Sequence, residues 1–352
     1  LGQIIGKTLR FTNTQSGGQK LLEWLRKVDK DLASTCIAME ATGHYWLALH
    51  SFLRKNGLTV RVINPIQSDS FRNLYIRQTK NDTKDAFIIA EVLRFGRYTT
   101  TELATEDIIA LRQLCRFRFS MVDTIADLKR KVISVMDMLF PEYEKLFSDL
   151  FGATSSELLM EFTTPEEILA VDTDELAAFI AKHSRNRLGW NKAEQLQTAA
   201  KSSFGIDFAL DAYRFQLRIL LQQIRFSEEQ LALLEKEIAD RLEKLNKHLI
   251  TIPGIGPILA ASIIGEIGDI SRFTTGAKLV AFAGIDPTVC QSGEFTGTRN
   301  HISKRGSPYL RRAIWLAANV AKIHNPILKD FYSRKLAQGK HSLSATGAVA
   351  RK

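Results

Sequence analysis

The first hundred residues switch between the two-residue period of strands and the longer period of amphipathic helices. Strands are predicted at Thr8–Thr12, 36–40 and 58–63. Helices are predicted at 18–33 and 44–56, and again from about residue 82. This alternation predicts an α/β layer that contains parallel strand pairing.

From residue 106 onward the apolar positions follow a heptad spacing in two separate segments. In the first segment, with Arg118 as the exception, these positions are 111, 114, 118, 121, 125, 128, 132, 135 and 139. In the second, with Ser227 and Arg241 as exceptions, they are 217, 220, 224, 227, 231, 234, 238, 241 and 245. The spacing predicts a coiled coil, within the chain or between chains, and it equally fits two long helices of one bundle.

These patterns divide the chain into three regions. Residues 1–105 form the α/β domain, and residues 106–248 hold the heptad helices with a helical insert at about 150–212. Inside the insert, Thr164 and the proline after it make a favourable helix start, because a hydroxyl caps the helix and proline fits its first turn. Residues 249–352 are punctuated by glycines, basic, and predicted to be mainly helical.

The charge balance points to a polyanionic partner. The chain has 352 residues, a formal net charge of +10 and a pI near 9.5. This excess of positive charge favours nucleic acid as the partner, and the alternative is a basic protein without one. No apolar run reaches the roughly 20 residues that a membrane span needs, so we expect no membrane partner.

The cysteines and histidines do not predict a metal site. Cys36, Cys115 and Cys290 lie far apart in the sequence and form no closely spaced pair. Their spacing argues against zinc and favours a reducing, cytoplasmic location. None of the 7 histidines has a partner at metal-ligand spacing, so they are interpreted as structural or surface residues.

Three acidic residues of the first region form a candidate metal site. Glu40 closes a predicted strand, at the edge where α/β proteins place their sites. Asp82 and Asp85 stand three residues apart at the start of a predicted helix, which puts both on one face. Converging carboxylates repel one another unless a cation holds them, and Mg²⁺ prefers such hard oxygen ligands.

The same two aspartates also have a simpler interpretation. Asp82 can cap the helix, and Asp85 can occupy its third position, where the helix dipole favours acids. The apolar side of this helix, which is expected to pack on the sheet, comprises Ala86, Ile89, Ala90 and Leu93. By spacing alone, the simpler interpretation is that the two aspartates stabilise the start of the helix.

The third region contains two candidate contacts with nucleic acid. Gly254 and Gly256 precede a helix of small residues and resemble a helix-hairpin-helix, in which glycines let the backbone approach a phosphate. A tight turn between packed helices is the alternative. A basic segment follows, and its cations are Lys304, Arg305, Arg311 and Arg312. These side chains fit either phosphate contacts or an ordinary solvated face.

Two stretches of the first region resemble the acidic domain of the DEDD transposases of insertion sequences. They are MEATGHYWLALHSFLRKNGLTVRVINP (39–65) and KNDTKDAFIIAEVLRFG (80–96). That family includes pilin-inversion recombinases and recombinases guided by a bridge RNA. The resemblance implies a RuvC-like, ribonuclease H-type fold for residues 1–105, followed by long coiled-coil helices and a mainly helical C-terminal domain.

The resemblance also implies roles for the three acids. The family's glutamate falls on Glu40 and its last two aspartates fall on Asp82 and Asp85, which implies that these residues bind Mg²⁺. The family's first aspartate ends a strand upstream of the segment that resembles residues 1–14, and this chain has no match for it. The sequence is therefore expected to begin after that strand.

Residues 276–318 resemble the C-terminal transposase domain of the same family. The matching motifs are AFAGIDP, a QSG turn and SKRGSPYLRRA. On this match Ser292 falls on the family's catalytic serine. A serine hydroxyl must be activated before it attacks, and nearby metal ions can provide the activation. The resemblance therefore implies DNA strand cleavage through a covalent phosphoserine, followed by rejoining.

The sequence as a whole predicts an insertion-sequence transposase that acts on donor and target DNA in the cytoplasm, associated with the nucleoid. The resemblance implies guidance by an RNA that the element encodes. A homo-oligomer, dimer or tetramer, would let the acids of one chain meet Ser292 of another. Two alternatives stay open: a metal-dependent nuclease resembling a junction resolvase, which uses activated water, and a non-catalytic nucleic-acid-binding scaffold.

Overall fold

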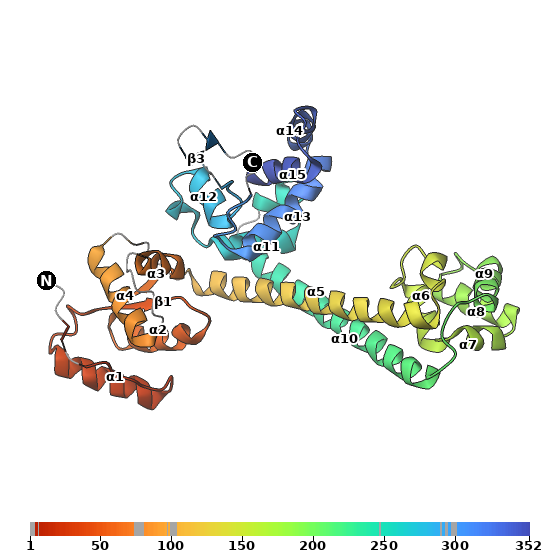
Figure 1. Ribbon diagram of the computed structural model, residues 1–352, viewed down its shortest axis with the longest axis horizontal. Coiled ribbons are helices and arrows are strands. Elements are labelled where there is room, and N and C mark those ends of the chain that lie inside the picture. Colours follow the sequence, from red (N-terminus) through yellow and green to blue (C-terminus); the bar gives the residue numbers. More distant parts are fainter. Residues whose placement is uncertain are drawn as a thin grey trace. The chain divides into compact units, whose positions relative to one another are not determined.

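The computed structural model covers most of the chain in two compact units, residues 1–103 and residues 104–352. The described residues are 4–5, 7–73, 81–96, 98, 104–245, 248–288, 291–292, 295–296 and 301–352, with the backbone alone at 291–292 and 295–296. Both units are rich in helices (Figure 1). Among the described residues, no helix combines the length and the apolar character that crossing a bilayer requires.

The heptad helices and the C-terminal region fall within the second of these units. Their division into two domains, predicted from the sequence, therefore stays a prediction.

The first unit is built on two parallel strands, β1 (Cys36–Glu40) and β2 (Thr59–Ile63). Helix α2 (Tyr45–Lys55) connects the strands, and Gly57, at a φ of +78°, turns the chain after the helix. The pairing places Glu40 opposite Ile63, so that both strands end at the same edge. The parallel pair predicted from the sequence is present, whereas the wider RuvC-like fold stays a prediction.

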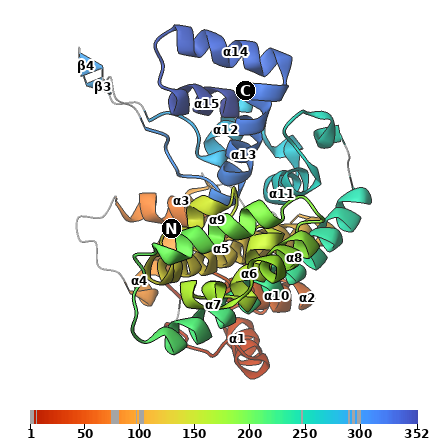
Figure 2. The same ribbon diagram turned by 90° about the vertical axis from the view of Figure 1, so that its right-hand side faces the viewer.

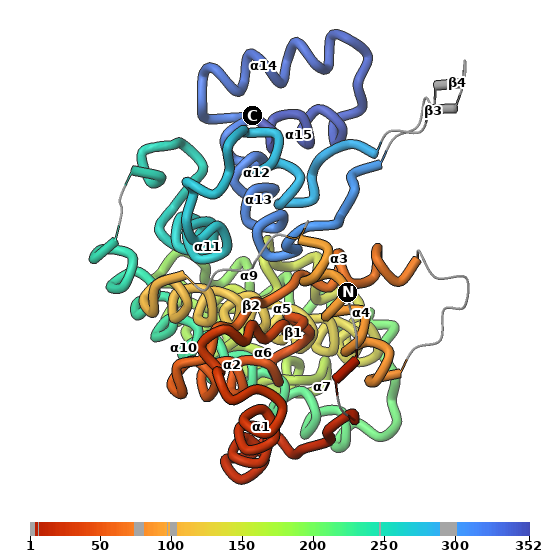
Figure 3. The backbone as a smooth tube through the Cα atoms, turned by 90° about the vertical axis from the view of Figure 1, so that its left-hand side faces the viewer, coloured from red at the N-terminus to blue at the C-terminus, as the bar shows by residue number. Residues whose placement is uncertain are grey.

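Helices cover both faces of this strand pair, as can be followed in Figure 3. One face packs against α1 (Gln15–Val28) and α2, and the buried members of that cluster are Leu22, Met39, Leu53, Leu58 and Val62. The other face packs against α3 (Pro65–Arg72) and α4 (Asp82–Phe95), and its buried members are Ile63, Ile88 and Val92. Since alternate residues of a strand point to opposite faces, Glu40 lies on the face that α3 and α4 cover.

One prediction for this unit is wrong and another is half right, since Ile89 and Leu93 pack on the cluster of α4 as predicted. Thr8–Thr12 forms no strand, because no described segment pairs with it and a lone strand leaves its backbone groups without partners. On α4, Ala86 and Ala90 are exposed, whereas Ile88 and Val92 are buried. The buried side of α4 is thus rotated toward the side that carries Asp85.

Two long antiparallel helices form the frame of the second unit (Figure 1). They are α5 (Glu106–Leu139) and α10 (Leu210–Glu243). Arg118 pairs with Glu235 at 2.7 Å, and Lys129 pairs with Glu228 at 2.7 Å. Arg118, the exception in the first heptad segment, thus finds a carboxylate on the facing helix. The buried heptad positions of α5 are Leu111, Ile125, Leu128, Val132, Val135 and Leu139. The two helices therefore pair within the chain.

Four short helices form the predicted insert at about 150–212, and the short helix η1 (Tyr143–Leu146) precedes them. The four are α6 (Ala153–Glu161), α7 (Pro165–Ala170), α8 (Thr173–His183) and α9 (Trp190–Lys201). At the start of α7, the Thr164 hydroxyl accepts from the Glu167 backbone N–H and the Glu167 carboxylate accepts from the Thr164 N–H. The helix start predicted at Thr164 is confirmed. The insert shares an apolar cluster with α5 and α10, which fixes it to their ends.

The C-terminal part of the second unit is also helical (Figure 2). Its elements are η2 (His248–Thr251), α11 (Pro257–Ile267), η3 (Ile270–Arg272), α12 (Gly276–Ala283), α13 (Pro308–His324), α14 (Pro326–Ala337) and α15 (Ser342–Arg351). Between α12 and α13 lie two short strands, β3 (Gln291–Ser292) and β4 (Phe295–Thr296).

A buried carboxylate ties α11 to α5 and α13. Glu266, which is 4% exposed, accepts two hydrogen bonds from Arg116 of α5, at 2.5 and 2.9 Å. It also accepts one from the Ser307 hydroxyl at 2.7 Å, and Ser307 caps α13 by accepting from the Leu310 N–H. A buried charge requires such partners, so this network fixes where α13 begins.

Candidate active site

The carboxylates of Glu40 and Asp85 contact one face of α3. Ser68, which is fully buried, donates a hydrogen bond to Glu40 Oε2 at 2.5 Å. Arg72, four residues later, donates from Nη2 to Asp85 Oδ1 at 2.8 Å. Residues four apart on a helix are neighbours on its surface. Helix α3 therefore brings the acid at the end of β1 and the acid at the start of α4 to a common element.

The local sequence explains why α3 presents this face. Asn64 caps the helix by accepting a hydrogen bond from the Ile66 N–H at 3.0 Å, and Pro65 occupies the first helical position. The helix therefore starts immediately after β2, with Ser68 and Arg72 one turn apart. Sequence reasoning missed both residues. The signal that could have found them was the Asn64-Pro65 pair, which begins a helix as well as ending a strand.

Arg72 balances the charge of Asp85 at this face. The Arg72 side chain is 15% exposed and that of Asp85 is 24% exposed. Arg72 also pairs with Asp69 at 2.6 Å, while its Nε atom is buried and has no hydrogen-bond partner among the described residues. Partial burial strengthens the attraction between opposite charges, since the effective dielectric constant falls. The positive charge next to Asp85 in this structure is therefore that of Arg72.

Asp82 lies at solvent, away from these contacts. Asn81, not Asp82, caps α4 by accepting a hydrogen bond from the Lys84 N–H at 2.9 Å. The predicted capping role of Asp82 is wrong, because the asparagine one residue earlier takes it. Asp82 becomes the first residue of α4 and is exposed, while Asp85 lies within the first turn.

The carboxylates of this site are suitable ligands for a hard divalent cation, but the three acids do not converge on one point. Carboxylate oxygens are the ligands that Mg²⁺ prefers. Within the described ranges, however, no three acidic, histidine or cysteine residues form a group that could hold a metal ion. The structure brings Glu40 and Asp85 to α3 and leaves Asp82 outside, so the metal site stays a prediction.

Ser292 is described by its backbone alone. Strand β3 pairs with β4 in an antiparallel hairpin that places Ser292 opposite Phe295. At the base of this loop the Thr288 N–H donates to the His301 carbonyl at 2.7 Å, and Pro287 and Ile302 form a β-bridge. The Ser292 side chain lies outside the described part of the chain. Ser292 belongs to the second unit and the three acids belong to the first.

The two glycines of the predicted helix-hairpin-helix have different surroundings. Gly254 has a φ of +102°, and a Cβ there would lie 2.8 Å from the Ala317 carbonyl oxygen and the Ala321 nitrogen of α13. Close packing against α13 therefore requires this glycine, which favours the tight-turn interpretation. Gly256 is exposed with open space around it, at the N-cap of α11. The role of both in nucleic-acid binding stays a prediction.

Alanine substitutions at the two glycines test the packing role of Gly254. We expect Gly254→Ala to lower the free energy of unfolding by more than ~1 kcal/mol, because the methyl group meets the α13 backbone and the φ angle is strained. Gly256→Ala has open space and should change stability by less than ~0.5 kcal/mol. Urea denaturation of the two variants measures this difference. Equal stabilities would contradict the packing role of Gly254.

The four candidate cations divide into two pairs. Lys304, with a φ of +53°, and Arg305 are exposed. Arg312 donates two hydrogen bonds to Asp123 of α5, at 2.8 and 2.7 Å, and these bonds hold the pKa of Asp123 below its ordinary value. Arg311 donates a long hydrogen bond of 3.4 Å to the Ala283 carbonyl. Arg311 and Arg312 thus make contacts within the protein, whereas Lys304 and Arg305 are exposed. A role of all four in nucleic-acid binding stays a prediction.

Comparison with known families identifies two transposase domains in the chain. Residues 1–141 match the DEDD transposase domain of the IS110 group, which is described as "Transposase". Residues 246–333 match a domain described as "Transposase IS116/IS110/IS902 family". The first match contains the strand pair, α3 and α4, and the second contains the loop of Ser292.

Relatives cover most of the chain. The uncharacterized 44.8 kDa protein of insertion element IS116 from Streptomyces clavuligerus is 25% identical over 90% of this chain and 79% of its own length. The pilin gene-inverting protein of Moraxella bovis is 22% identical over 97% of this chain and 84% of its own length. The transposase of insertion element IS1328 from Yersinia enterocolitica is 33% identical over 26% of this chain and 28% of its own length. The chain therefore carries, in order, the two transposase domains of the IS110/IS116 group.

Proposed function

We propose that this protein is a DNA transposase or recombinase that cuts and rejoins strands through Ser292, with Mg²⁺ held by Glu40, Asp82 and Asp85. The presence of both transposase domains supports the reaction class. The single structural observation that carries the proposal is the contact of Glu40 and Asp85 with one face of α3. The two acids lie on the face of the parallel strand pair that α3 and α4 cover. Glu40 is at the strand end, where α/β proteins place their sites.

The proposed reaction exchanges one phosphate ester for another. The Ser292 hydroxyl oxygen attacks a backbone phosphorus atom, and a new P–O bond to serine forms as the bond to one DNA strand end breaks. The released strand end takes up a proton as a free hydroxyl group. Rejoining reverses the exchange, when the hydroxyl group of another strand end attacks the phosphoserine. The bond count is conserved throughout, so the reaction needs no external energy source.

The residues around the acids have defined tasks in this proposal. Bound Mg²⁺ would neutralise charge on the reacting phosphate and favour an ionised hydroxyl nucleophile. Ser68 orients the Glu40 carboxylate through its hydrogen bond to Oε2. Arg72 holds Asp85 in place, with Asp69 as its second, exposed partner. Groups that orient metal ligands in this way influence metal affinity.

The proposed partners are donor and target DNA together with an RNA that the element encodes, in the cytoplasm and at the nucleoid. The net charge of +10 supports contact with polyanions. We expect the affinity for DNA to fall by about 10³–10⁵-fold between about 50 and 200 mM salt, as for about 6–10 phosphate contacts. Fluorescence anisotropy with labelled duplex measures the salt slope. A flat response would remove the case for a nucleic-acid partner.

An exposed apolar stripe on α10 supports a homo-oligomer. Its members are Phe215, Ile219, Phe226 and Leu233, which are 69%, 39%, 62% and 63% exposed. Spacings of four and seven residues place these side chains on one face of the helix, as in a coiled-coil seam. Because α5 covers a different face of α10, this stripe is available to a second copy of the chain. The proposed assembly is a dimer or tetramer in which the acids of one subunit serve Ser292 of another.

Introducing negative charges into the apolar stripe tests this assembly. We expect Phe226→Glu combined with Leu233→Glu to shift the protein to monomers in light scattering at micromolar concentration, because charges replace apolar contacts. The matched control is Trp190→Glu, which alters an apolar side chain on the insert that is 50% exposed. A wild-type protein that is monomeric with DNA and RNA present would contradict the proposed oligomer.

A further inference from the structure

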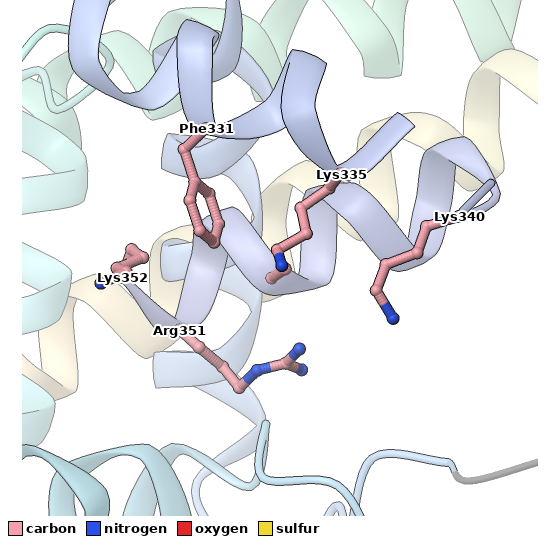
Figure 4. A pocket seen from close by; sticks show the side chains of 6 residues that line it. Phe331, Lys335, Lys340, Arg351 and Lys352 are labelled. Atoms are coloured by element: carbon pink, nitrogen blue, oxygen red, sulfur yellow. The ribbon is translucent and has the colours of Figure 1, made fainter. Parts of the chain in front are cut away.

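A basic cup between α14 and α15 lies outside the residues that the proposed reaction uses. Its volume is about 460 Å³, and it is lined by Phe331, Lys335, Lys340, Ala348, Arg351 and Lys352. The cationic ends of Lys335, Lys340 and Arg351 surround one opening, as Figure 4 shows. The lining contains four cationic side chains and no acidic side chain.

These four cations differ from most of the arginines described above. Arg116, Arg118 and Arg312 pair with carboxylates on neighbouring helices. On α14 itself, Arg334 pairs with Asp330 at 3.0 Å. Across the described residues, none of the four cup cations forms an ion pair with an acidic side chain. Like charges gathered without counter-charges repel one another, and an anion in the cup would relieve that repulsion.

Phe331 organises the cup. The Lys335 ammonium lies 5.4 Å from the centre of its ring, the Lys352 ammonium 5.6 Å and the Arg334 guanidinium 5.9 Å. Cations within about 6 Å of an aromatic ring are attracted to its face. With its surroundings occupied by cations, the ring serves as a platform that holds positive charge and not as a stacking surface for a base. The cup therefore presents charge without features that would read a sequence.

Neighbouring polar contacts hold two cup residues in place. Lys335 Nζ donates to Gln338 Oε1 at 3.0 Å, and Arg351 Nη1 donates to the Ile285 carbonyl at 3.4 Å. Ile285 follows α12, at the start of the segment that leads to the Ser292 hairpin. Lys340 is exposed and stands in the turn between α14 and α15. The cup is thus tied to the segment that precedes the Ser292 loop.

We propose that this cup binds backbone phosphates of nucleic acid, with Lys335 and Lys340 as the principal contacts. The inference rests on the proposed function, because it assigns a second contact for the same polyanionic partner. Phosphate contacts of this kind position a duplex or strand and carry no sequence information. Duplex DNA and single-stranded RNA offer the same phosphodiester chemistry. The change in the salt dependence of binding, measured with each ligand, distinguishes them.

The test compares Lys340→Gln with Lys329→Gln. Lys329 lies on α14, is exposed and does not line the cup, so that both substitutions remove the same charge nearby. Anisotropy measures binding of labelled duplex DNA and of labelled single-stranded RNA over a range of salt concentrations. For Lys340→Gln the slope of log K against log salt should shrink by about 0.9 if duplex occupies the cup, or about 0.7 if a single strand does. The Lys335→Gln, Lys340→Gln double variant should lose about twice as much, and Lys329→Gln should match the wild type.

The outcomes separate this inference from the proposed function. If Lys340→Gln and the double variant both keep the wild-type salt slope, the cup is not a phosphate-binding site. The proposed function is unaffected by that result. Wild-type protein without any salt-dependent binding overturns the proposed function itself. Binding to vesicles with anionic headgroups that the double variant alone loses, with its nucleic-acid slopes intact, assigns the cup to lipid and overturns the inference. Unchanged thermal melting of the variants shows that they remain folded.

Discussion

Asp85→Asn is expected to lower DNA strand cleavage by about 10²–10⁴-fold, because a metal ion at such a site supplies several kcal/mol of charge stabilisation. The amide has nearly the shape of the carboxylate but lacks the charge that binds a cation. Glu40→Gln and Asp82→Asn are expected to have effects of the same order. Calorimetric titration of the protein with Mn²⁺, without DNA, should show weaker binding in each of the three variants.

Asp69→Asn is the matched control for this experiment. Asp69 pairs with the same Arg72 as Asp85 does, at 2.6 Å, but its side chain is 65% exposed. An exposed ion pair contributes ~1 kcal/mol or less, so cleavage and Mn²⁺ binding should stay near wild type. If Asp69→Asn and Asp85→Asn lose activity equally, the loss reflects the Arg72 contacts and not metal binding. Full activity of Asp85→Asn would support the non-catalytic scaffold.

Ser292→Ala is expected to reduce strand cleavage and joining by at least about 10³-fold, because removal of a nucleophile leaves only binding and charge stabilisation. Affinity for DNA should stay within about threefold, since the hydroxyl makes at most one of many contacts. The measurements are a cleavage assay on supercoiled donor DNA and an anisotropy titration.

Ser271→Ala controls for the loss of a hydroxyl group elsewhere in the same unit. Ser271 is exposed in η3, where it donates a hydrogen bond to Asp269. This variant should cleave at the wild-type rate. An active Ser292→Ala would favour the metal-dependent nuclease, in which water attacks and the serine has no part.

The sequence predicted those elements whose signals are local. The strand at Cys36–Glu40, the long helices and the capped start of α7 each follow from hydrophobic period or capping chemistry. Gly57 and Gly96, both at positive φ after a helix, end α2 and α4. Thr8–Thr12 failed because a strand depends on a partner, and alternation along one segment does not supply it.

Side-chain partners across elements could not be read from the sequence. Ser68 and Arg72 have ordinary surroundings in the chain, and only the packing of α3 shows that they contact Glu40 and Asp85. Arg312, which stays a candidate for phosphate contact, donates hydrogen bonds to Asp123, far away in sequence. Gly254 was a candidate for approach to a phosphate or for a tight turn, and the close approach of α13 favours the tight turn. In each case the deciding partner lies on another element.

A covalent bond between DNA and Ser292 is the central feature of the proposed reaction. Reaction mixtures of full-length protein, donor DNA and Mg²⁺ can be stopped with denaturant, digested with nuclease and protease, and analysed by mass spectrometry. We predict a peptide that carries a nucleotide phosphate on Ser292, and its loss in both Ser292→Ala and Asp85→Asn. Cleaved DNA with free ends and no modified peptide would contradict the account.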